Sequence, residues 1–428
     1  MSQRRAVVTG LGVVSPVGIG ADASWEALVA GRSGLAEVTL FDTTDFEMKV
    51  GGEVKGFDAT QYMDARDVRR HDRNTHLAVA ATREALQAAG LLDGDRRLNG
   101  DADADRFGIV FGTGIGGIGM VSDGIKTLLE RGPSRISPFL LPHMLPDSAS
   151  GQVAIEFGIR GPNLAVVSAC ATGGHAVGEA METIVRGQAD LMLGAGTEAV
   201  IVPLAFAGFQ QMKALGTPRD PDTGEYDPAM ASRPFDATRD GFVVAEGASV
   251  LVLEELEHAR ARGAQPIAEV IGYGSSADAY HMVQPSERGE GNVRAMRAAL
   301  ARAAIGPEQV DYINAHGTST PLNDRYETMA IREVFGDHAD RLAVSSTKSM
   351  TGHMMGAAGA FEAFACVKAI QTGCLPPTIN YRHPDPELTL DYVPNSARQA
   401  NPRVALSNSM GLGGHNSTVI VRRFEDGV

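Results

Sequence analysis

Three short turns, each carrying a cysteine or a histidine, hold the side chains best suited to chemistry. Cys170 stands in the run Ser-Ala-Cys-Ala-Thr-Gly-Gly (168–174), where a strand pattern passes into a helix pattern. Backbone N–H groups at the start of a helix lower the pKa of a thiol and can stabilise an oxyanion. The position suits a nucleophile, although a buried free cysteine that packs as a small apolar residue fits the local sequence equally well.

Two histidines occupy turns of the same kind further along the chain. His316 lies in Asn-Ala-His-Gly-Thr-Ser-Thr-Pro (314–321), and His353 lies in the glycine-rich stretch 346–359. Both follow predicted strands, and the ends of strands in α/β sheets are where ligand-binding groups are placed. Each histidine alone is compatible with a capping or turn role. Three such turns in one chain indicate a shared site.

A lysine and a glutamate flank the second histidine. Lys348 precedes His353 by five residues, and Glu362 follows Lys348 by fourteen, on a predicted helix. A buried lysine needs a partner, and Glu362 would serve as one. The spacing alone, however, favours two solvated surface charges.

Two glycine-rich runs have weaker meanings. The run Gly-Thr-Gly-Ile-Gly-Gly (112–117) matches the dinucleotide pattern G-x-G-x-x-G, but no second strand ending in an acidic residue follows it, so we do not predict a dinucleotide site. The run Gly-Leu-Gly-Gly-His-Asn (411–416) joins two strand patterns and is compatible with a site lined by N–H groups or with a tight β-turn. The sequence contains no G-x-S-x-G, Walker, H-E-x-x-H or C-x-x-C motif, so hydrolase, NTPase and zinc functions have no support.

The elements that position these turns alternate between short Val/Ile/Leu-rich runs and alanine-rich stretches of helical period, which is typical of an α/β protein. The predicted strands are 6–9, 107–111, 164–168, 191–194, 250–254, 267–273, 311–314, 343–345, 403–407 and 417–422. The predicted helices are 76–89, 173–186, 293–303, 327–334 and 357–372.

A similarity between two segments of the chain indicates an internal duplication. Residues 167–180 and 344–357 both run from a strand through a turn of small residues into a glycine-rich helix start. We place the boundary between two similar halves in the charged stretch 254–265. This gives an N-terminal half, 1–260, with the cysteine, and a C-terminal half, 261–428, with both histidines.

Composition sets the limits within which this site must work. The 428 residues are 43% hydrophobic and 21% charged, enough for a large core, and 38 basic against 52 acidic residues give a net charge of −14, which argues against nucleic-acid binding. Apolar runs stop short of the roughly 18 to 20 residues of a membrane span, and the first residues do not read as a signal peptide, so we expect a cytoplasmic protein. Three cysteines do not form a disulfide framework.

The cysteine and two histidine motifs, in this order, resemble the β-ketoacyl-acyl-carrier-protein synthases of the thiolase-like superfamily, specifically the elongating synthase II type. The likeness runs over nearly the whole chain, from 6–16 to 411–416. Synthases that start chains use Cys, His and Asn, so His353 in third place favours elongation. The resemblance implies two duplicated α/β halves forming a five-layered α-β-α-β-α core, a homodimer, and acyl carrier protein as the partner.

The resemblance also implies a mechanism. Cys170 would accept an acyl group as a thioester, with its oxyanion held by the N–H groups of Cys170 and Leu412. His316 and His353 would bind the thioester carbonyl of the malonyl carrier protein and stabilise the enolate formed on decarboxylation. The carbanion would then attack the acyl-cysteine and give a β-ketoacyl product two carbons longer. Thiolates suit acyl transfer in both directions, and neutral imidazoles suit donation to an enolate oxygen.

Supporting positions carry over in the same way. Lys348, paired with Glu362, would tune and orient His353. No cofactor is required, and the only metal ion that the resemblance implies is a structural K⁺ or Na⁺. The remaining positions are Thr318 and Thr320 for the pantetheine arm, Ile115 and Phe209 for the acyl pocket, Asp278 and His281 for a mobile loop at the entrance, Asn314, Glu362, Ser407 and Asn408 for the monovalent cation, and Arg66, Arg69, Arg70, Arg135 and Lys213 for docking of the acidic carrier protein.

One departure from the family pattern concerns the gate between the malonyl site and the acyl pocket. The family usually has phenylalanine at the positions of Met410 and Leu412.

There are three alternative functions for the chain. A thiolase would carry a second catalytic cysteine in 375–428, where there is none, and a non-catalytic chain-length partner would lack Cys170. A ketosynthase subunit of a type II polyketide system would look nearly the same.

Overall fold

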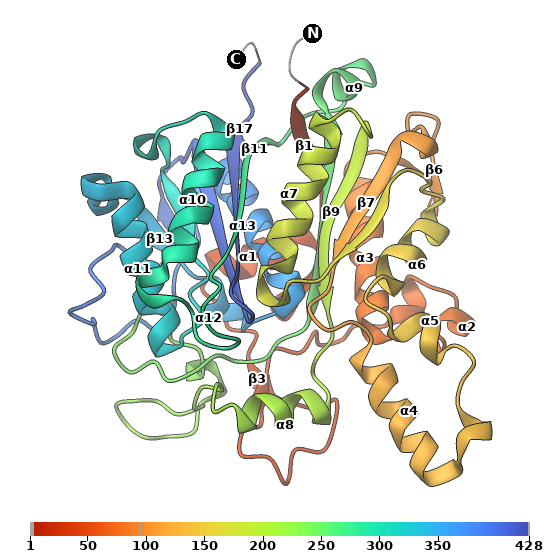
Figure 1. The fold of residues 1–428 in the computed structure, drawn as a ribbon, viewed down its shortest axis with the longest axis horizontal. Helices are drawn as coiled ribbons and strands as arrows, with labels where there is room; N and C mark the ends of the chain where they lie inside the picture. Colours follow the sequence, from red (N-terminus) through yellow and green to blue (C-terminus); the bar gives the residue numbers. More distant parts are fainter. Residues whose placement is uncertain (1–3, 95, 427–428) are drawn as a thin grey trace.

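The computed structural model describes residues 4–94 and 96–426, and its centre is one continuous sheet (Figure 1). The sheet consists of two five-stranded halves, which meet where β1 (Ala6–Ser15) pairs antiparallel with β11 (Ala268–Ala277). The order along the main path is β13-β12-β16-β17-β11-β1-β10-β9-β7-β8. The short strand β2 (Gly18–Ile19) pairs with β1 off this path.

The two halves repeat the same topology. In the N-terminal half β1, β10 (Gly247–Glu255) and β9 (Leu191–Glu198) pair antiparallel, and β7 (Phe107–Gly112) and β8 (Asn163–Val166) continue parallel to β9. The C-terminal half repeats this with β11, β17 (His415–Arg423), β16 (Val404–Gly411), β12 (Tyr312–Asn314) and β13 (Ala343–Ser345) in the equivalent places. The predicted duplicated α/β fold is therefore confirmed.

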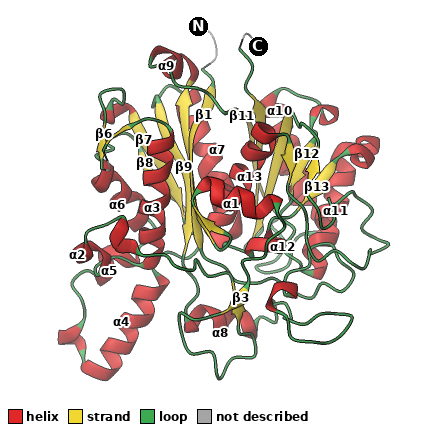
Figure 2. Cartoon of the chain, turned by 180° about the vertical axis from the view of Figure 1, so that it is seen from behind, coloured by secondary structure: helices red, strands yellow, loops and turns green. Residues whose placement is uncertain are grey.

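Helices form three further layers around the two half-sheets. Helices α7 (Thr172–Val185) and α13 (Ala358–Thr372) lie between the halves, and each contacts strands of both. Helix α3 (Arg73–Ala88) covers β1 and β10 on one outer face, and α10 (Glu290–Ala303) covers β11 and β17 on the other (Figures 1 and 2). Strand β1 admits α3 closely because a Cβ on Gly12 would lie 1.9 Å from the carbonyl oxygen of Ala81.

The other elements extend this core or connect it. The remaining α-helices are α1 (Ala21–Val29), α2 (Ala65–Val68), α4 (Ile118–Arg131), α5 (Leu140–Met144), α6 (Ser148–Phe157), α8 (Pro203–Gln211), α9 (Leu256–Ala261), α11 (Pro321–Phe335) and α12 (Lys348–Thr351). Short strand pairs are β3 (Ala36–Glu37) with β4 (Val50–Gly51), β5 (Leu92–Asp93) with β6 (Arg97–Leu98), and β14 (Cys374–Leu375) with β15 (Arg398–Gln399). The 3-10 helices near the site are η3 (Pro133–Arg135), η4 (Ala169–Ala171) and η9 (Met355–Ala357).

Each predicted strand and helix overlaps an observed one, but several ends differ. Strand β1 continues to Ser15, beyond the predicted end at residue 9, and α11 starts six residues before the predicted 327. The sequence patterns do not predict α1, α2, α4, α5, α6, α8, α9 or α12. Within 4–94 and 96–426, none of the helices combines the length and the apolar character that crossing a membrane requires.

Candidate active site

The ends of three elements bring the cysteine and both histidines to one cavity. Cys170 lies in η4 between β8 and α7, His316 follows β12, and His353 follows α12. All three side chains line a single cavity of about 320 Å³. The convergence that the sequence predicted is therefore present.

Cys170 is buried beside the loop that follows β16. A Cβ on Gly411 would lie 3.0 Å from the Cys170 backbone nitrogen, so this loop passes directly against η4, and the Leu412 N–H donates a hydrogen bond to the thiol. Burial raises the pKa of Cys170 to about 11, against smaller opposing effects from the Lys348 charge and the Leu412 N–H. The predicted lowering of this pKa is wrong because desolvation of the thiolate outweighs the helix start.

His353 presents two free ring nitrogens. Both are buried and have no hydrogen-bond partner among the described residues, while the backbone is fixed by its N–H to Val243 O (2.7 Å) and by Ala245 N–H to its own carbonyl (3.0 Å). The ring of Phe242 meets the imidazole edge-to-face at 5.7 Å. Burial lowers the pKa of His353 well below 6.5, with a contribution from Lys348, so the ring is neutral at neutral pH.

His316 is held on two sides. Its ring lies 5.3 Å from that of His353, centroid to centroid, and its Nδ1 lies 3.4 Å from Lys348 Nζ. Because the ammonium has only donors, Nδ1 accepts and the ring proton resides on Nε2. The carboxylate of Glu327 accepts the backbone N–H groups of His316 and Gly317 at 2.8 Å each. Burial, with Lys348 second, lowers the pKa of His316 well below 6.5.

Lys348 and Glu362 form a buried ion pair. Their side chains are 3% and 1% exposed, so the prediction of two solvated surface charges is wrong. The reason is that α13 lies between the two half-sheets and is buried on all sides, which leaves Glu362 no path to solvent. Burial raises the pKa of Glu362 to about 7 against the lowering effect of Lys348. The direct contact of Lys348 is with His316 rather than with His353, whose pKa it affects only through its charge.

Residues predicted to bind substrate divide into two groups. Thr318 and Thr320 line the cavity, with their hydroxyl oxygens 2.9 Å apart, and Phe209 and Asp278 also line it. Ile115 and His281 are not among the lining residues in the described part of the chain. His281 instead accepts the N–H groups of Val283 and Gln284 and so forms a local turn beside the entrance.

Asp278 connects two loops at the entrance. Its carboxylate accepts hydrogen bonds from Asn416 Nδ2 (2.8 Å) and from the N–H of Ser286 (2.9 Å), and its own N–H donates to the Gly414 carbonyl (2.8 Å). Leu412, the departure from the family's phenylalanine, is exposed on the cavity wall next to this connection. Met410 lines the same wall.

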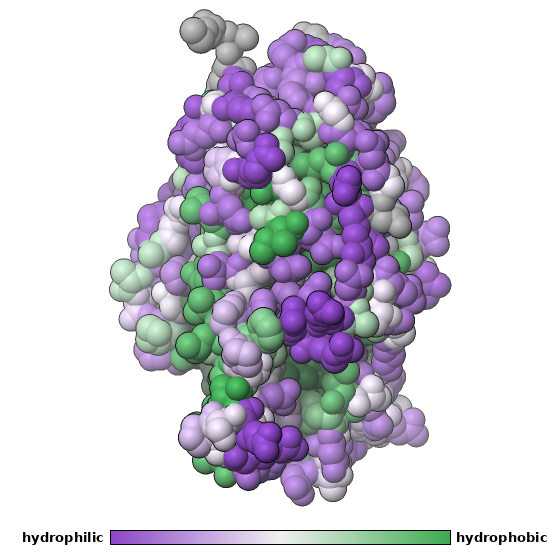
Figure 3. Space-filling model, turned by 90° about the vertical axis from the view of Figure 1, so that its right-hand side faces the viewer, coloured by the Kyte–Doolittle hydropathy of each residue, from purple (hydrophilic) through white to green (hydrophobic). Residues whose placement is uncertain are grey.

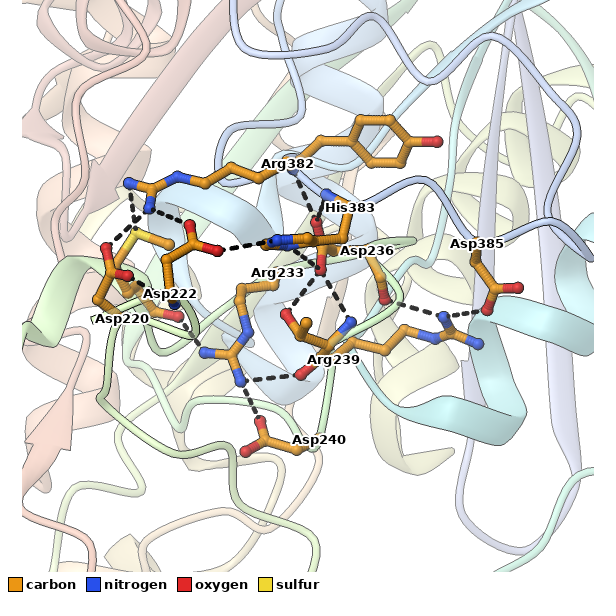
Figure 4. Close-up of polar contacts among 12 residues, drawn as sticks. Asp220, Asp222, Arg233, Asp236, Arg239, Asp240, Arg382, His383 and Asp385 are labelled. Atoms are coloured by element: carbon orange, nitrogen blue, oxygen red, sulfur yellow. Dashed lines mark hydrogen bonds and ion pairs between the residues drawn. The ribbon is translucent and has the colours of Figure 1, made fainter. Parts of the chain in front are cut away.

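A charged network surrounds the segment that leads to Asp240 and Phe242 (Figure 4). Buried Arg233 donates to Asp240 at 2.8 Å and to the carbonyls of Thr217, Met230 and Thr238, which closes the loop that returns to Phe242. Asp240 and Phe242 line the cavity. Arg382 and His383 extend the network to Asp220, Asp222 and Asp236. This network fixes the rim that carries Lys213, which also lines the cavity.

The predicted docking residues lie on exposed parts of the surface. Arg66 and Arg69 are exposed in and just after α2, and Arg135 is exposed in η3. Arg70 is half-buried because its guanidinium lies over the ring of Phe139, 4.5 Å from the centroid, next to α5.

The predicted cation positions lie near one another behind the site. Asn314 and Ser407 are partners across the β12–β16 pair, and Asn314 Oδ1 is buried without a hydrogen-bond partner among the described residues. An orphaned carbonyl oxygen fits a monovalent cation. Asn408 fits less well, because its Oδ1 already accepts from Thr418 (2.8 Å).

Three residues that support the surroundings of the site were not predicted from the sequence. Glu327 fixes the His316 loop, Phe242 packs on His353, and Glu198 binds the loop after β7. Both glutamates are fully buried, and burial raises the pKa of each to about 7. Glu327 stands at the start of a predicted helix eleven residues after His316, which is the one signal that could have pointed to it.

Comparison with known proteins identifies the sequence motifs. The model of the family "Beta-ketoacyl synthase, N-terminal domain" matches residues 3–259, and that of "Beta-ketoacyl synthase, C-terminal domain" matches residues 267–382. The 3-oxoacyl-[acyl-carrier-protein] synthase 2 of Synechocystis sp. is 48% identical over 425 residues, which is 99% of each chain.

Solved structures are similar over the same length. The ishigamide ketosynthase/chain length factor superposes with a TM-score of 0.89 at 37% identity, covering 99% of this chain and 100% of that one. A type II polyketide synthase acyl carrier protein in complex with its ketosynthase, bound to the hexaketide, includes a chain that superposes with a TM-score of 0.88 at 34% identity and the same coverage.

Proposed function

Because the chain belongs to the β-ketoacyl synthase family, we propose that Cys170, His316 and His353 together condense malonyl-acyl carrier protein with an acyl-cysteine. The enzyme is an elongating 3-oxoacyl-[acyl-carrier-protein] synthase, an acyltransferase of fatty acid synthesis. The observation that supports this division of roles is that one cavity joins a buried thiol to two neutral imidazoles, one of which has both ring nitrogens unpaired.

In the first half-reaction the Cys170 sulfur attacks the thioester carbonyl of an acyl carrier protein. The new S–C bond forms, the bond to the pantetheine sulfur breaks, and the thiol proton leaves with the departing pantetheine thiol. The N–H groups of Cys170 and Leu412 hold the developing oxyanion, and the Leu412 N–H already points at the sulfur. Burial keeps the resting thiol protonated, so the sulfur ionises only as it attacks.

In the second half-reaction the histidines act on malonyl carrier protein. His316 Nε2–H and a His353 ring N–H donate to the thioester carbonyl oxygen, so the electrons of the breaking C–CO₂ bond are stabilised as an enolate. The enolate carbon attacks the acyl-cysteine carbonyl, the S–C bond breaks, and Cys170 leaves as a thiolate that takes up a proton from solvent to restore the thiol. Lys348, held by Glu362, fixes the tautomer of His316 by donating to Nδ1.

The test separates the two halves of the reaction. In Cys170→Ala, condensation stops because no acyl-enzyme forms, while decarboxylation of malonyl carrier protein continues because both imidazoles remain. Carbon dioxide release and β-ketoacyl product are measured in parallel. If the variant still elongates acyl carrier protein, the proposed nucleophile is wrong.

Fatty acid synthesis is favoured over the polyketide alternative by identity. The Synechocystis relative shares 48% of its residues with this chain, whereas the type II polyketide ketosynthase shares 34% and the ishigamide ketosynthase/chain length factor 37%. We expect the enzyme to act on these carrier-bound substrates in the cytoplasm. Chain-length preference then depends on the cavity walls.

We further propose that the acidic acyl carrier protein docks on basic residues at and outside the cavity entrance. Lys213 lines the cavity, Arg70 is half-buried, and the other members of this group are exposed cations on a protein of net charge −14. Local positive charge on an acidic protein steers an acidic partner to one face. The docking group consists of Arg66, Arg69, Arg70, Arg135 and Lys213.

The outer edge of β8 supports a homodimer. β8 ends the sheet, so among the described residues no strand pairs with its second edge, and Leu164 is 59% exposed there. Figure 3 shows hydrophobic side chains gathered on this face of the molecule. The exposed apolar residues of the adjoining elements are Ile125, Leu128, Leu129, Leu141, Leu145, Ile155 and Val167.

An open strand edge beside apolar side chains is stabilised by pairing with the same edge of a second copy. Light scattering on the wild type should give a dimer, and Leu164→Asp should shift it toward the monomer. A monomeric wild type would contradict the proposal.

A monovalent cation remains a further prediction. Asn314 Oδ1 and Ser407 would hold it, with Asn408 contributing less. Its charge would favour the ionised form of Glu362, which burial disfavours.

A further inference from the structure

Glu198, the last residue of β9, is a fully buried carboxylate that the reaction above does not use. Its exposed fraction is 0%, and no lysine, arginine or histidine of the described residues forms an ion pair with it. Burial raises its pKa to about 7. A buried carboxylate without a cation is costly, so its hydrogen bonds must carry its stabilisation.

Four donors from two separate segments satisfy this carboxylate. From the loop after β7 it accepts the hydroxyl of Thr113 (2.8 Å) and the N–H groups of Gly114 (2.6 Å) and Ile115 (3.3 Å). From η9 it accepts the N–H of Gly356 (3.0 Å). The loop N–H groups that a G-x-G-x-x-G motif would offer to a phosphate are therefore already occupied by Glu198.

The two segments that Glu198 joins meet beside the nucleophile. A Cβ on Gly114 would lie 2.7 Å from Glu198 Oε2, 3.4 Å from the Gly356 nitrogen and 3.5 Å from the Ala169 carbonyl oxygen. Ala169 precedes Cys170, so the loop and η9 both lie close to η4. A Cβ on Gly356 would lie 2.2 Å from the Gly114 nitrogen, so the close approach of η9 to the loop requires glycine at position 356.

The side chains next to these backbone contacts are apolar. Met355 precedes Gly356, lines the cavity, and packs in one cluster with Cys170. Ile118, at the start of α4, packs against the same cluster. An acyl chain attached to Cys170 is therefore surrounded by this apolar cluster.

We propose that Glu198 is a positioning residue that sets acyl-chain selectivity, by joining the Thr113–Ile115 loop to η9 and so fixing the position of Met355 beside Cys170. The proposal rests on the proposed function, since it requires an acyl group on Cys170. A short acyl group contacts only the immediate surroundings of the sulfur. A long one also contacts the apolar cluster that includes Met355 and Ile118.

The carboxylate is suited to this role because it is an acceptor at every lone pair. In Glu198→Gln the amide NH₂ faces backbone N–H groups, so at least one of the four hydrogen bonds is lost and the two segments separate. The effect on chemistry at the sulfur is indirect. The effect on the distance between the Thr113–Ile115 loop and η9 is direct.

The test compares acylation of Cys170 by acetyl and lauroyl carrier proteins in Glu198→Gln. We expect the ratio of lauroyl to acetyl kcat/KM to fall about tenfold, mostly through KM, with acetyl turnover changed by less than about twofold. Thr113→Val, which removes a single donor to Glu198, should give a smaller change in the same direction. This second variant keeps the test decisive if Glu198→Gln folds poorly.

The matched control is Glu84→Gln. Glu84 also accepts two backbone N–H groups, those of Val13 (2.8 Å) and Ala21 (2.7 Å), but it lies on α3, on the outer face of the sheet. It should lower the melting temperature without changing the ratio. An equal loss for both acyl groups in Glu198→Gln, or no change in the ratio, would overturn the positioning role. A wild type that acquires no acyl group on Cys170 would overturn the proposed function as well.

Discussion

The turn that precedes α7 and the turn that precedes α13 occupy equivalent places in the two halves, yet they are built differently. Residues 167–171 join β8 to α7 through small side chains only, whereas residues 346–357 join β13 to α13 and include the whole of α12. The short turn presents a thiol in apolar surroundings. The long turn has room for Lys348 and His353 and places a charge behind the imidazoles.

The difference between the two turns shows how one duplicated scaffold can serve two half-reactions. Around Cys170, burial dominates and raises the pKa of the thiol to about 11. Around the histidines, burial and the Lys348 charge both lower the pKa, so the rings stay neutral donors. We therefore expect variants of the two turns to affect separate steps.

The largest effect should come from the two histidines, His353 in the long turn and His316 in the loop after β12. His316→Ala and His353→Ala should each lower the rate of malonyl decarboxylation by about 10²- to 10³-fold, because each removes one N–H donor from the enolate oxygen. Acylation of Cys170 should change only a few-fold. Carbon dioxide release measures decarboxylation, and intact-protein mass measures acylation of Cys170. Equal losses in both rates would contradict the prediction that the histidines and Cys170 act in separate steps.

The next effect concerns the ion pair behind the histidines. Lys348→Met leaves Glu362 buried without its cation, which should destabilise the fold by about 3 kcal/mol at pH 8. The pKa of Glu362, already raised to about 7, then rises further, so the folded variant takes up a proton at a higher pH than the wild type. The loss therefore shrinks as the pH falls from 8 toward about 7 and stays constant below that.

Urea unfolding at pH 8 and pH 6 measures this difference. Lys368→Met is the matched control on the same helix, because Lys368 pairs with Asp22, whose side chain is 89% exposed. Its effect should be small and nearly independent of pH. A similar pH profile for both variants would show that burial of Glu362 is not the cause.

The reactivity of Cys170, in the short turn, should depend on pH. Since the pKa of Cys170 is raised to about 11, the thiolate fraction and the rate of alkylation by iodoacetamide should rise about tenfold per pH unit between about pH 8 and about pH 10. Decarboxylation should stay nearly constant over this range, because the histidines are neutral throughout. An alkylation rate that levels off below pH 8 would indicate a lowered pKa instead.

The smallest effect should come from the surface. Arg69→Glu combined with Arg70→Glu should raise KM for acyl carrier protein on the order of fivefold with little change in kcat, because the charges steer encounter rather than act on bound substrate. Arg297→Glu, an exposed arginine on α10 of the other half, is the control and should leave KM unchanged. An unchanged KM in the double variant would remove Arg69 and Arg70 from the docking group.

The catalytic side chains could be predicted from the sequence because each stands in a turn whose neighbours are unusually small. The duplication could also be predicted from the sequence, but the predicted alignment of the two halves is wrong. The similarity aligns 167–180 with 344–357, yet α7 begins at Thr172 and α13 only at Ala358, after the second stretch ends. The insertion of α12 in the C-terminal half has no counterpart in the first half and shifts the alignment.

Burial of charge could not be predicted. Helix α13 lies between two half-sheets, so it has no polar face whose period would have shown Glu362 to be internal. Glu198 ends a buried strand and follows no motif, and its partners are backbone N–H groups, which any sequence supplies. Such partners become visible only when the segments that carry them are placed in space.

The most direct test of the account is mass analysis of the intact protein after exposure to an acyl carrier protein, with the modified peptide mapped, followed by addition of malonyl carrier protein. The account predicts an acyl group on Cys170 alone, which is then lost as a β-ketoacyl product two carbons longer appears. An acyl group on another residue, or one on Cys170 that malonyl carrier protein does not discharge, would contradict it.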